Sequence, residues 1–179
     1  MPPTNTPNQP YNTMPEATPL IAGILPYLQD DLQDRVMQAF TYEFQFASFT
    51  NTGQATISLD NISHFICTSM QAQVWTGANP PTAVSPAPMT LQINDTGSGQ
   101  YIAFPNIVGA MLGNWSGTGQ LPFQFTVPRQ FSAASQLQAI LTAFDNSRAF
   151  TAYISLSGAK IFGTYRDGSP GGVLPPLTY

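Results

Sequence analysis

The sequence predicts an all-β protein, an antiparallel β-sandwich or jelly roll with an extended N-terminal arm and one short helix. The main observation is that apolar and polar residues alternate with a period of two in segments 136–144 and 150–161. Such alternation indicates strands, because successive side chains of a strand point to opposite faces of a sheet. Clusters of Asp, Asn, Gly and Pro between these segments are typical of the turns of a sandwich.

The alternating pattern predicts seven or eight strands, among the segments 41–49, 54–59, 65–75, 89–94, 100–104, 123–127, 136–144 and 150–161. In segment 65–75 the even-numbered residues form the apolar set, so we expect the core side to hold Ile66, Thr68, Met70, Ala72 and Val74. The short helix is expected from about Pro26 to Val36, because Leu25, Leu28 and Leu32 recur at helical intervals. Asp30, Asp31 and Asp34 then lie on its solvated side rather than in a metal site.

Proline divides the chain into three predicted regions. Residues 1–24 form a proline-rich arm, because repeated prolines exclude a helix or a central strand. The arm is expected to become ordered on a neighbouring subunit, and a dangling tail is the alternative. Residues 25–162 form the β-sandwich, and residues 163–179 form an irregular C-terminal tail. Within the sandwich, 77–88 is a proline-rich connector, either a surface loop or an edge-strand excursion, and 106–119 is a packed loop or short helix.

The composition excludes several classes of function. Charged residues make up 8% of the 179 residues, against about 25% in an average protein. No Lys or Arg occurs between Val36 and Pro128, so we expect no nucleic-acid binding, which needs cations to neutralise phosphates. No apolar run is long enough to span a bilayer, so we expect no membrane insertion. A polar but uncharged surface favours contact with other proteins, although it can also be a neutral surface without a special purpose.

The few residues suited to catalysis are scattered. His64 is the one histidine and Cys67 the one cysteine, so we expect no metal, no cofactor and no enzyme activity. His64 is predicted to be a polar residue of a turn. Cys67 lies in an apolar run and is predicted to be buried. Lys160 is predicted to be an exposed residue at the end of the last strand.

The block from Leu121 to Phe162 resembles the closing half of small tailed-bacteriophage virion proteins. It has a proline-bounded strand, a strand that ends in a polar turn, and a strand that ends in Leu156-Ser157-Gly158-Ala159-Lys160. The resemblance implies a virion protein, most simply a capsid cement or decoration protein that bridges capsid subunits. A minor head-to-tail connector or head-fibre base component is the alternative within this class. The implied partners are the major capsid protein or other virion proteins, and a homo-oligomer, either a dimer or a trimer.

Apolar and aromatic residues outside the strand cores are the candidate interface. In chain order they are Pro7, Pro10, Tyr11, Met14, Trp75, Met111 and Trp115. A different class of function remains open, because Trp75, Trp115 and Tyr101 could form a stacking platform for a sugar. The alternative for these rings is a place in the core or in a protein interface.

Overall fold

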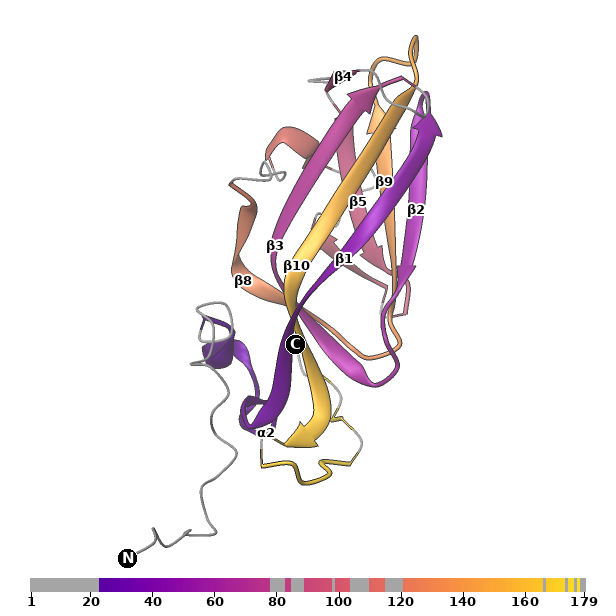
Figure 1. Ribbon diagram of the computed structural model, residues 1–179. Coiled ribbons are helices and arrows are strands. Elements are labelled where there is room, and N and C mark those ends of the chain that lie inside the picture. The colour runs from indigo at the N-terminus through magenta and orange to yellow at the C-terminus, as the bar shows by residue number, and fades with distance from the viewer. Residues whose placement is uncertain are drawn as a thin grey trace, which may run out of the picture.

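The computed structural model describes residues 23–77, 83–84, 89–97, 99–103, 110–114, 121–165, 167–172, 174–175 and 177. Residues 1–22 of the predicted arm and most of the proline-rich connector therefore lie outside the described residues. The predicted all-β sandwich is confirmed, because the described strands form two five-stranded antiparallel sheets that pack face to face (Figure 1).

The strands divide between two sheets, which we call sheet A and sheet B. Sheet A has the order β1-β10-β3-β4, with β8 also paired to β3. Its strands are β1 (Arg35–Phe49), β3 (Ser63–Thr76), β4 (Ala83–Val84), β8 (Phe123–Phe131) and β10 (Phe150–Tyr165). Sheet B has the order β2-β9-β5-β6, with β7 paired to β5. Its strands are β2 (Thr52–Ser58), β5 (Met89–Asp95), β6 (Gln100–Ala103), β7 (Ala110–Met111) and β9 (Gln136–Ala143).

The strand pairs are nested within one another. The first strand pairs with the last, β1 with β10, and inside this pair β2 pairs with β9, β3 with β8 and β5 with β6. The chain thus follows the path of one long antiparallel hairpin that is rolled into two layers (Figure 1). Most strand contacts therefore join residues that are distant in sequence, which local alternation does not encode.

The main core lies between the sheets and contains the side chains that alternation assigned to one face. Each large apolar side chain buried there contributes about 1.5–3 kcal/mol. The alternation predicted for segments 41–49, 89–94, 136–144 and 150–161 is confirmed, because alternate residues are buried in the main core, including Phe44, Phe46, Met89, Leu91, Ile93, Leu137, Ala139, Leu141, Ala152, Ile154 and Leu156.

Strand β3 contains a bulge at Thr68. In its pairing with β10, Ser69 lies opposite Ser157, whereas Cys67 lies opposite Gly158. Thr68 is therefore an extra residue in β3, and its hydroxyl donates a hydrogen bond to the Ser157 carbonyl oxygen at 3.2 Å. An extra residue of this kind shifts the alternation of the strand that carries it.

The predicted core face of β3 is correct after the bulge and wrong before it. Met70 and Val74 point into the main core as predicted, but Phe65 and Cys67 join them there from the other side of the bulge. Ile66 points to the opposite face and belongs to a second, smaller core. The buried position predicted for Cys67 is confirmed, and burial raises the pKa of its thiol to about 12.

The predicted helix over Pro26–Val36 is too long. A 3-10 turn, η1 (Leu25–Tyr27), is followed by a single helical turn, α2 (Asp30–Gln33), and β1 already begins at Arg35. Gln29 separates the two helical pieces because its backbone is extended, with φ −60° and ψ 146°. The helical spacing of leucines arose because Leu28 and Leu32 both face the second core.

The second core lies at one end of sheet A, on the face directed away from sheet B. Figure 1 shows that the start of β1 and the end of β10 continue together past the sandwich, with α2 beside them. We call this end the base. Its apolar residues, all buried, are Ile24, Leu28, Leu32, Met37, Ile66, Ala159, Ile161 and Leu177. At the base, β10 extends to Tyr165, so it continues past its predicted end at Ile161 into the segment that was expected to be an irregular tail.

Candidate interaction surfaces

Sheet A has a polar and almost uncharged face on the side that points away from the main core. This face begins at the bulge and extends away from the base. Residues that lie opposite one another in register share one face of a sheet. The register places in rows Thr41–Ser157–Ser69, Glu43–Ser155–Gln71, Gln45–Tyr153–Gln73 and Thr151–Trp75. We call these four rows the outer face. Its one charged residue is Glu43, and the other polar groups are neutral amides and hydroxyls.

The side chains of the outer face hold one another in place. The hydroxyls of Thr41 and Ser157 are 3.0 Å apart and share a hydrogen bond. The carboxylate of Glu43 accepts hydrogen bonds from the Gln45 amide at 3.1 Å and from the Ser155 hydroxyl at 3.5 Å. Because these contacts already restrict the rotamers, a partner that binds here orders fewer side chains.

An aromatic pair lies at the far end of the outer face. The rings of Trp75 and Tyr153 meet edge to face, with centroids 5.4 Å apart and planes at 86°. This is a preferred geometry of aromatic pairs. Both side chains are half-buried, so each ring keeps part of its surface available to a partner.

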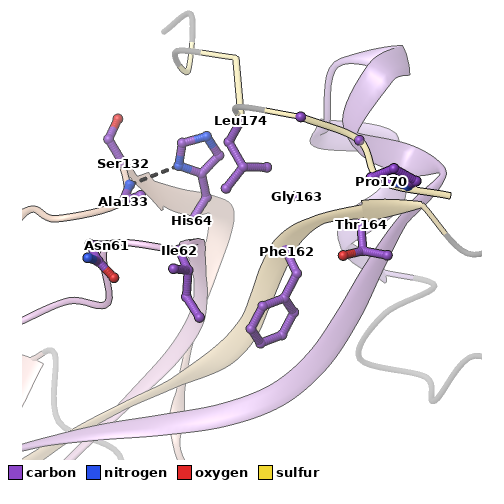
Figure 2. A pocket seen from close by; sticks show the side chains of 12 residues that line it. Asn61, Ile62, His64, Ser132, Ala133, Phe162, Gly163, Thr164, Pro170 and Leu174 are labelled. Atoms are coloured by element: carbon purple, nitrogen blue, oxygen red, sulfur yellow. Dashed lines mark hydrogen bonds between the residues drawn. The ribbon is translucent and has the colours of Figure 1, made fainter. Parts of the chain in front are cut away.

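A mostly apolar cleft of about 760 Å³ lies at the base, between the start of β3 and the end of β10. Figure 2 shows Ile62, His64 and Phe162 in its wall, with Pro170 and Leu174 of the C-terminal segment beside them. Among the lining residues that the structure describes, His64 is the one titratable side chain.

His64 is a buried residue of β3 that is hydrogen-bonded to two other segments, so the prediction that it is a polar turn residue is wrong. It is 3% exposed. The backbone N–H of Ala133 donates to its Nδ1 at 2.9 Å, drawn in Figure 2, and Nε2 lies 2.8 Å from the carbonyl oxygen of Pro175. These partners require the neutral ring with its proton on Nε2, because Nδ1 accepts and the carbonyl needs a donor. Burial lowers the pKa of His64, and in this arrangement neither nitrogen is free to take a proton from a substrate.

Lys160 is also buried, so its predicted exposed position is wrong. It is 6% exposed and forms an ion pair with Asp60. Its ammonium group lies 3.3 Å from the centroid of the Phe40 ring, a cation–π contact. Burial by itself lowers the pKa of Lys160, but the hydrogen bonds to Asp60 and Tyr42 outweigh that effect and leave the pKa raised. The lysine therefore stays charged and joins β10 to the turn before β3.

Arg35 joins the N-terminal and C-terminal parts of the base. It is 2% exposed, and its guanidinium donates to the Asp31 carboxylate at 2.9 Å and to the Gly163 carbonyl oxygen. The guanidinium also stacks on the Tyr165 ring, 4.2 Å from its centroid. The hydroxyl of Tyr165 donates to the same carboxylate, and the hydrogen bonds from Arg35 and Tyr165 lower the pKa of Asp31.

Two of the seven predicted interface residues have side chains that the structure describes. Trp75 lies on the outer face, and Met111 is 38% exposed on sheet B, so the structure does not bring them together on one surface. The other five, outside the described residues, are Pro7, Pro10, Tyr11, Met14 and Trp115. The predicted stacking platform likewise cannot be assembled from described side chains, because Trp75 is its one described member.

The sequence did not lead us to group Tyr153 with Gln45, Gln71 and Gln73 as one surface. Part of the pattern is visible within a single strand, because Ser69, Gln71 and Gln73 alternate with the apolar residues of segment 65–75. What the sequence does not show is that Gln45, Tyr153 and Gln73 are neighbours, because their strands pair across the whole length of the chain.

The comparisons with known proteins add no relative from which a role could be inferred. No family model, curated protein or solved structure matched the chain. In the part of the chain that the structure describes, no helix has the length and apolar character needed to cross a membrane. Within those same ranges, no cluster of three or more His, Cys, Asp or Glu side chains is placed to hold a metal ion.

Proposed function

We propose that this chain is a structural component of a virion, most simply a cement or decoration protein that binds a capsid. The observation that carries the proposal is the strand order. Numbered along the chain without the two-residue strands β4 and β7, the eight remaining strands pair first with last, second with seventh, third with sixth and fourth with fifth. This nested order supports a jelly roll, a double-sheet fold found in viral capsid and lectin domains.

A fold alone does not determine a function, so the proposal also depends on the surface. The outer face offers amide and hydroxyl groups with one carboxylate. Neutral polar groups cost less to desolvate in an interface than charged ones, and aromatic rings such as the Trp75–Tyr153 pair are enriched at binding sites. A neutral, polar face suits a protein that lies against the subunits of a shell.

The size of the outer face limits how it can act. The four rows run from Thr151 to Ser157 along β10, six residue steps or roughly 20 Å, and cross three strands, roughly 15 Å, which gives about 300 Å². A stable interface needs about 800 Å² from each partner. A single outer face therefore binds weakly, and tight attachment needs several copies bound together or an additional contact.

The test is the composition of purified particles. Virus particles from lysates that contain this chain should carry it at a constant ratio to the major capsid protein, measured by quantitative mass spectrometry. Placing a charge on the outer face with Gln73→Glu should lower its occupancy at least about tenfold, or ~1.4 kcal/mol. The control is Gln54→Glu on β2, which is equally exposed and should bind normally. Absence of the chain from particles would refute the proposal.

A connector or head-fibre base component is the alternative position within the same class. The copy number distinguishes these positions, because a connector or a fibre base occupies few sites on a particle, whereas cement occupies a large share of the shell. The same mass-spectrometric ratio therefore decides between them.

Carbohydrate binding is a second candidate, favoured by the Trp75–Tyr153 pair beside Gln71 and Gln73. Aromatic rings stack on the apolar faces of sugars, and amides can donate to their hydroxyls. A glycan array provides the test, and Trp75→Phe, which keeps a ring, is compared with Trp75→Ala. Binding that survives in the first variant and disappears in the second would support a sugar site; an array without binding would remove this candidate.

A further inference from the structure

The outer edge of β1 is the longest unpaired strand edge among the described residues. β1 spans Arg35–Phe49 and stands at the end of sheet A, with β10 on one side and no described strand on the other. An edge strand directs half of its backbone N–H and C=O groups away from the sheet. Figure 1 shows that the first half of β1 lies beyond the end of β2, with α2 beside its first residues, so that the edge is open from Gln38 onward.

This edge lacks the features by which proteins usually prevent edge-to-edge pairing. Such edges are normally short, or they carry Lys, Pro or a bulge. From Val36 to Phe49 the strand contains neither Lys, Arg nor Pro, and Glu43 is its one charged residue. Its pairing with β10 runs without a bulge from Met37 to Phe46. Four consecutive residues, Gln38 to Thr41, are exposed, including Phe40 at 36%.

A strand that pairs along this edge supplies backbone N–H groups, and each proline removes one, so a proline-free strand is the better match. Prolines recur in residues 1–22, in 78–88 and in 173–179, and 104–109 contains Pro105. Segment 115–120 has six residues, and two of them are glycines. A proline-free strand of matching length is, however, present in every other copy of the chain, namely β1 itself.

We propose that two copies of this chain pair antiparallel through β1, so that their sheets A join into one continuous sheet. The two-fold axis passes at Phe40, so that Phe40 of each copy lies opposite its symmetry mate and Ala39 lies opposite Thr41. This register buries the exposed segment. It also separates the two Glu43 carboxylates by six residues along the strand, or about 20 Å, which keeps the like charges apart.

The pairing does not rest on the proposed function, but it would complement it. In the joined sheet the two outer faces are on the same side, each beside the covered base of the other copy, so that one dimer presents two separate patches of about 300 Å².

The test begins with the mass of the full chain in solution. Sedimentation equilibrium at micromolar concentration should give twice the 19.3 kDa of a single chain. Ala39→Lys adds an exposed charge to the edge and brings two lysines to diagonal positions across the axis, so it should return the mass to that of one chain. Thr56→Lys on the exposed face of β2 is the matched control and should remain a dimer. A single-chain mass for the unmodified protein, or dissociation by Thr56→Lys in place of Ala39→Lys, would overturn the proposal.

A cross-link tests the register. Directly opposed residues of antiparallel strands have Cα atoms about 4.5–5.5 Å apart, within the range that a disulfide spans. Phe40→Cys should therefore form a covalent dimer on mild oxidation, whereas Thr56→Cys should not. Cys67 will not interfere, because it is buried and its pKa is raised to about 12. Failure of Phe40→Cys to cross-link, with the fold confirmed by circular dichroism, would contradict the register.

Discussion

Gly158 is the residue whose replacement should most directly test the account of sheet A. It lies in β10 opposite Cys67, next to the bulge of β3. A Cβ atom at this position would lie 2.8 Å from the carbonyl carbon of Ile66, 2.9 Å from the Cα of Cys67, and in direct overlap with the Ile66 carbonyl oxygen. All three are backbone atoms, so no rotation of a side chain can relieve the overlap.

The magnitude follows from the size of the overlap. The Ile66 oxygen would overlap the new Cβ directly, so the strands must separate by more than 1 Å to reach a normal C···O contact of about 3.3–3.6 Å. Overpacking in a core typically costs 1–3 kcal/mol and occasionally more, and a clash with a central backbone belongs at the upper end. We expect Gly158→Ala to destabilise the protein by about 3 kcal/mol, which corresponds to a melting temperature lower by roughly 6–12 °C.

The assay is urea unfolding followed by circular dichroism and tryptophan fluorescence. The control is Gly113→Ala, because a Cβ at Gly113 meets no atom within 4 Å; that variant should unfold within about 0.5 kcal/mol of the unmodified protein. If Gly158→Ala is as stable as the control, then β3 and β10 do not pair around a bulge at Thr68. The assignment of β3 side chains to the two faces of sheet A, before and after Thr68, would then be wrong as well.

Three further predictions concern the buried polar groups. Burial lowers the pKa of His64 below its ordinary 6.5, so the unfolded chain binds more protons below that pH; the melting temperature should fall as the pH drops below about 6.5, and His64→Gln should flatten this decline. Lys160→Ala should cost about 2–3 kcal/mol in urea unfolding, whereas Lys160→Met, which keeps the contact with Phe40, should cost less, because Asp60 is partly exposed and remains hydrated. Arg35→Lys keeps the charge, but an ammonium group cannot donate in the fixed directions of the planar guanidinium. Limited proteolysis should therefore cleave segment 163–172 faster in this variant. An unchanged cleavage rate would exclude Arg35 as the residue that holds this segment in place.

Much of the fold could be predicted from local patterns, for a physical reason. Alternation in segments 136–144 and 150–161 reports which side chains face the core, because one face of each strand packs on the opposite sheet. The pattern holds wherever the strand is regular. It fails in β3, because the bulge at Thr68 shifts the alternation in the middle of an apolar run and no residue type marks it.

The polar groups of the base could not be predicted, because their partners are distant in the sequence. His64 bonds to a carbonyl 111 residues away, and Lys160 pairs with an aspartate 100 residues away. Lysine is mostly exposed in proteins and histidine is intermediate, so the local sequence does not predict that either residue is buried. The outer face could not be predicted for the same reason, since each of its rows combines residues from strands that are far apart in the chain.

The outward face of sheet A changes at the bulge from apolar and covered to polar and nearly uncharged. On the base side, the outward-facing residues of β1 and β10, such as Met37 and Ile161, are apolar and are covered by Leu32 and its neighbours. Further along the same face, the same alternation presents Glu43 and Ser155. The cover formed by residues 24–33 therefore ends where the outer face begins. A partner on the outer face would lie next to this segment and could extend the cover along the sheet, and neutral amides and hydroxyls permit such burial at a smaller desolvation cost than charges.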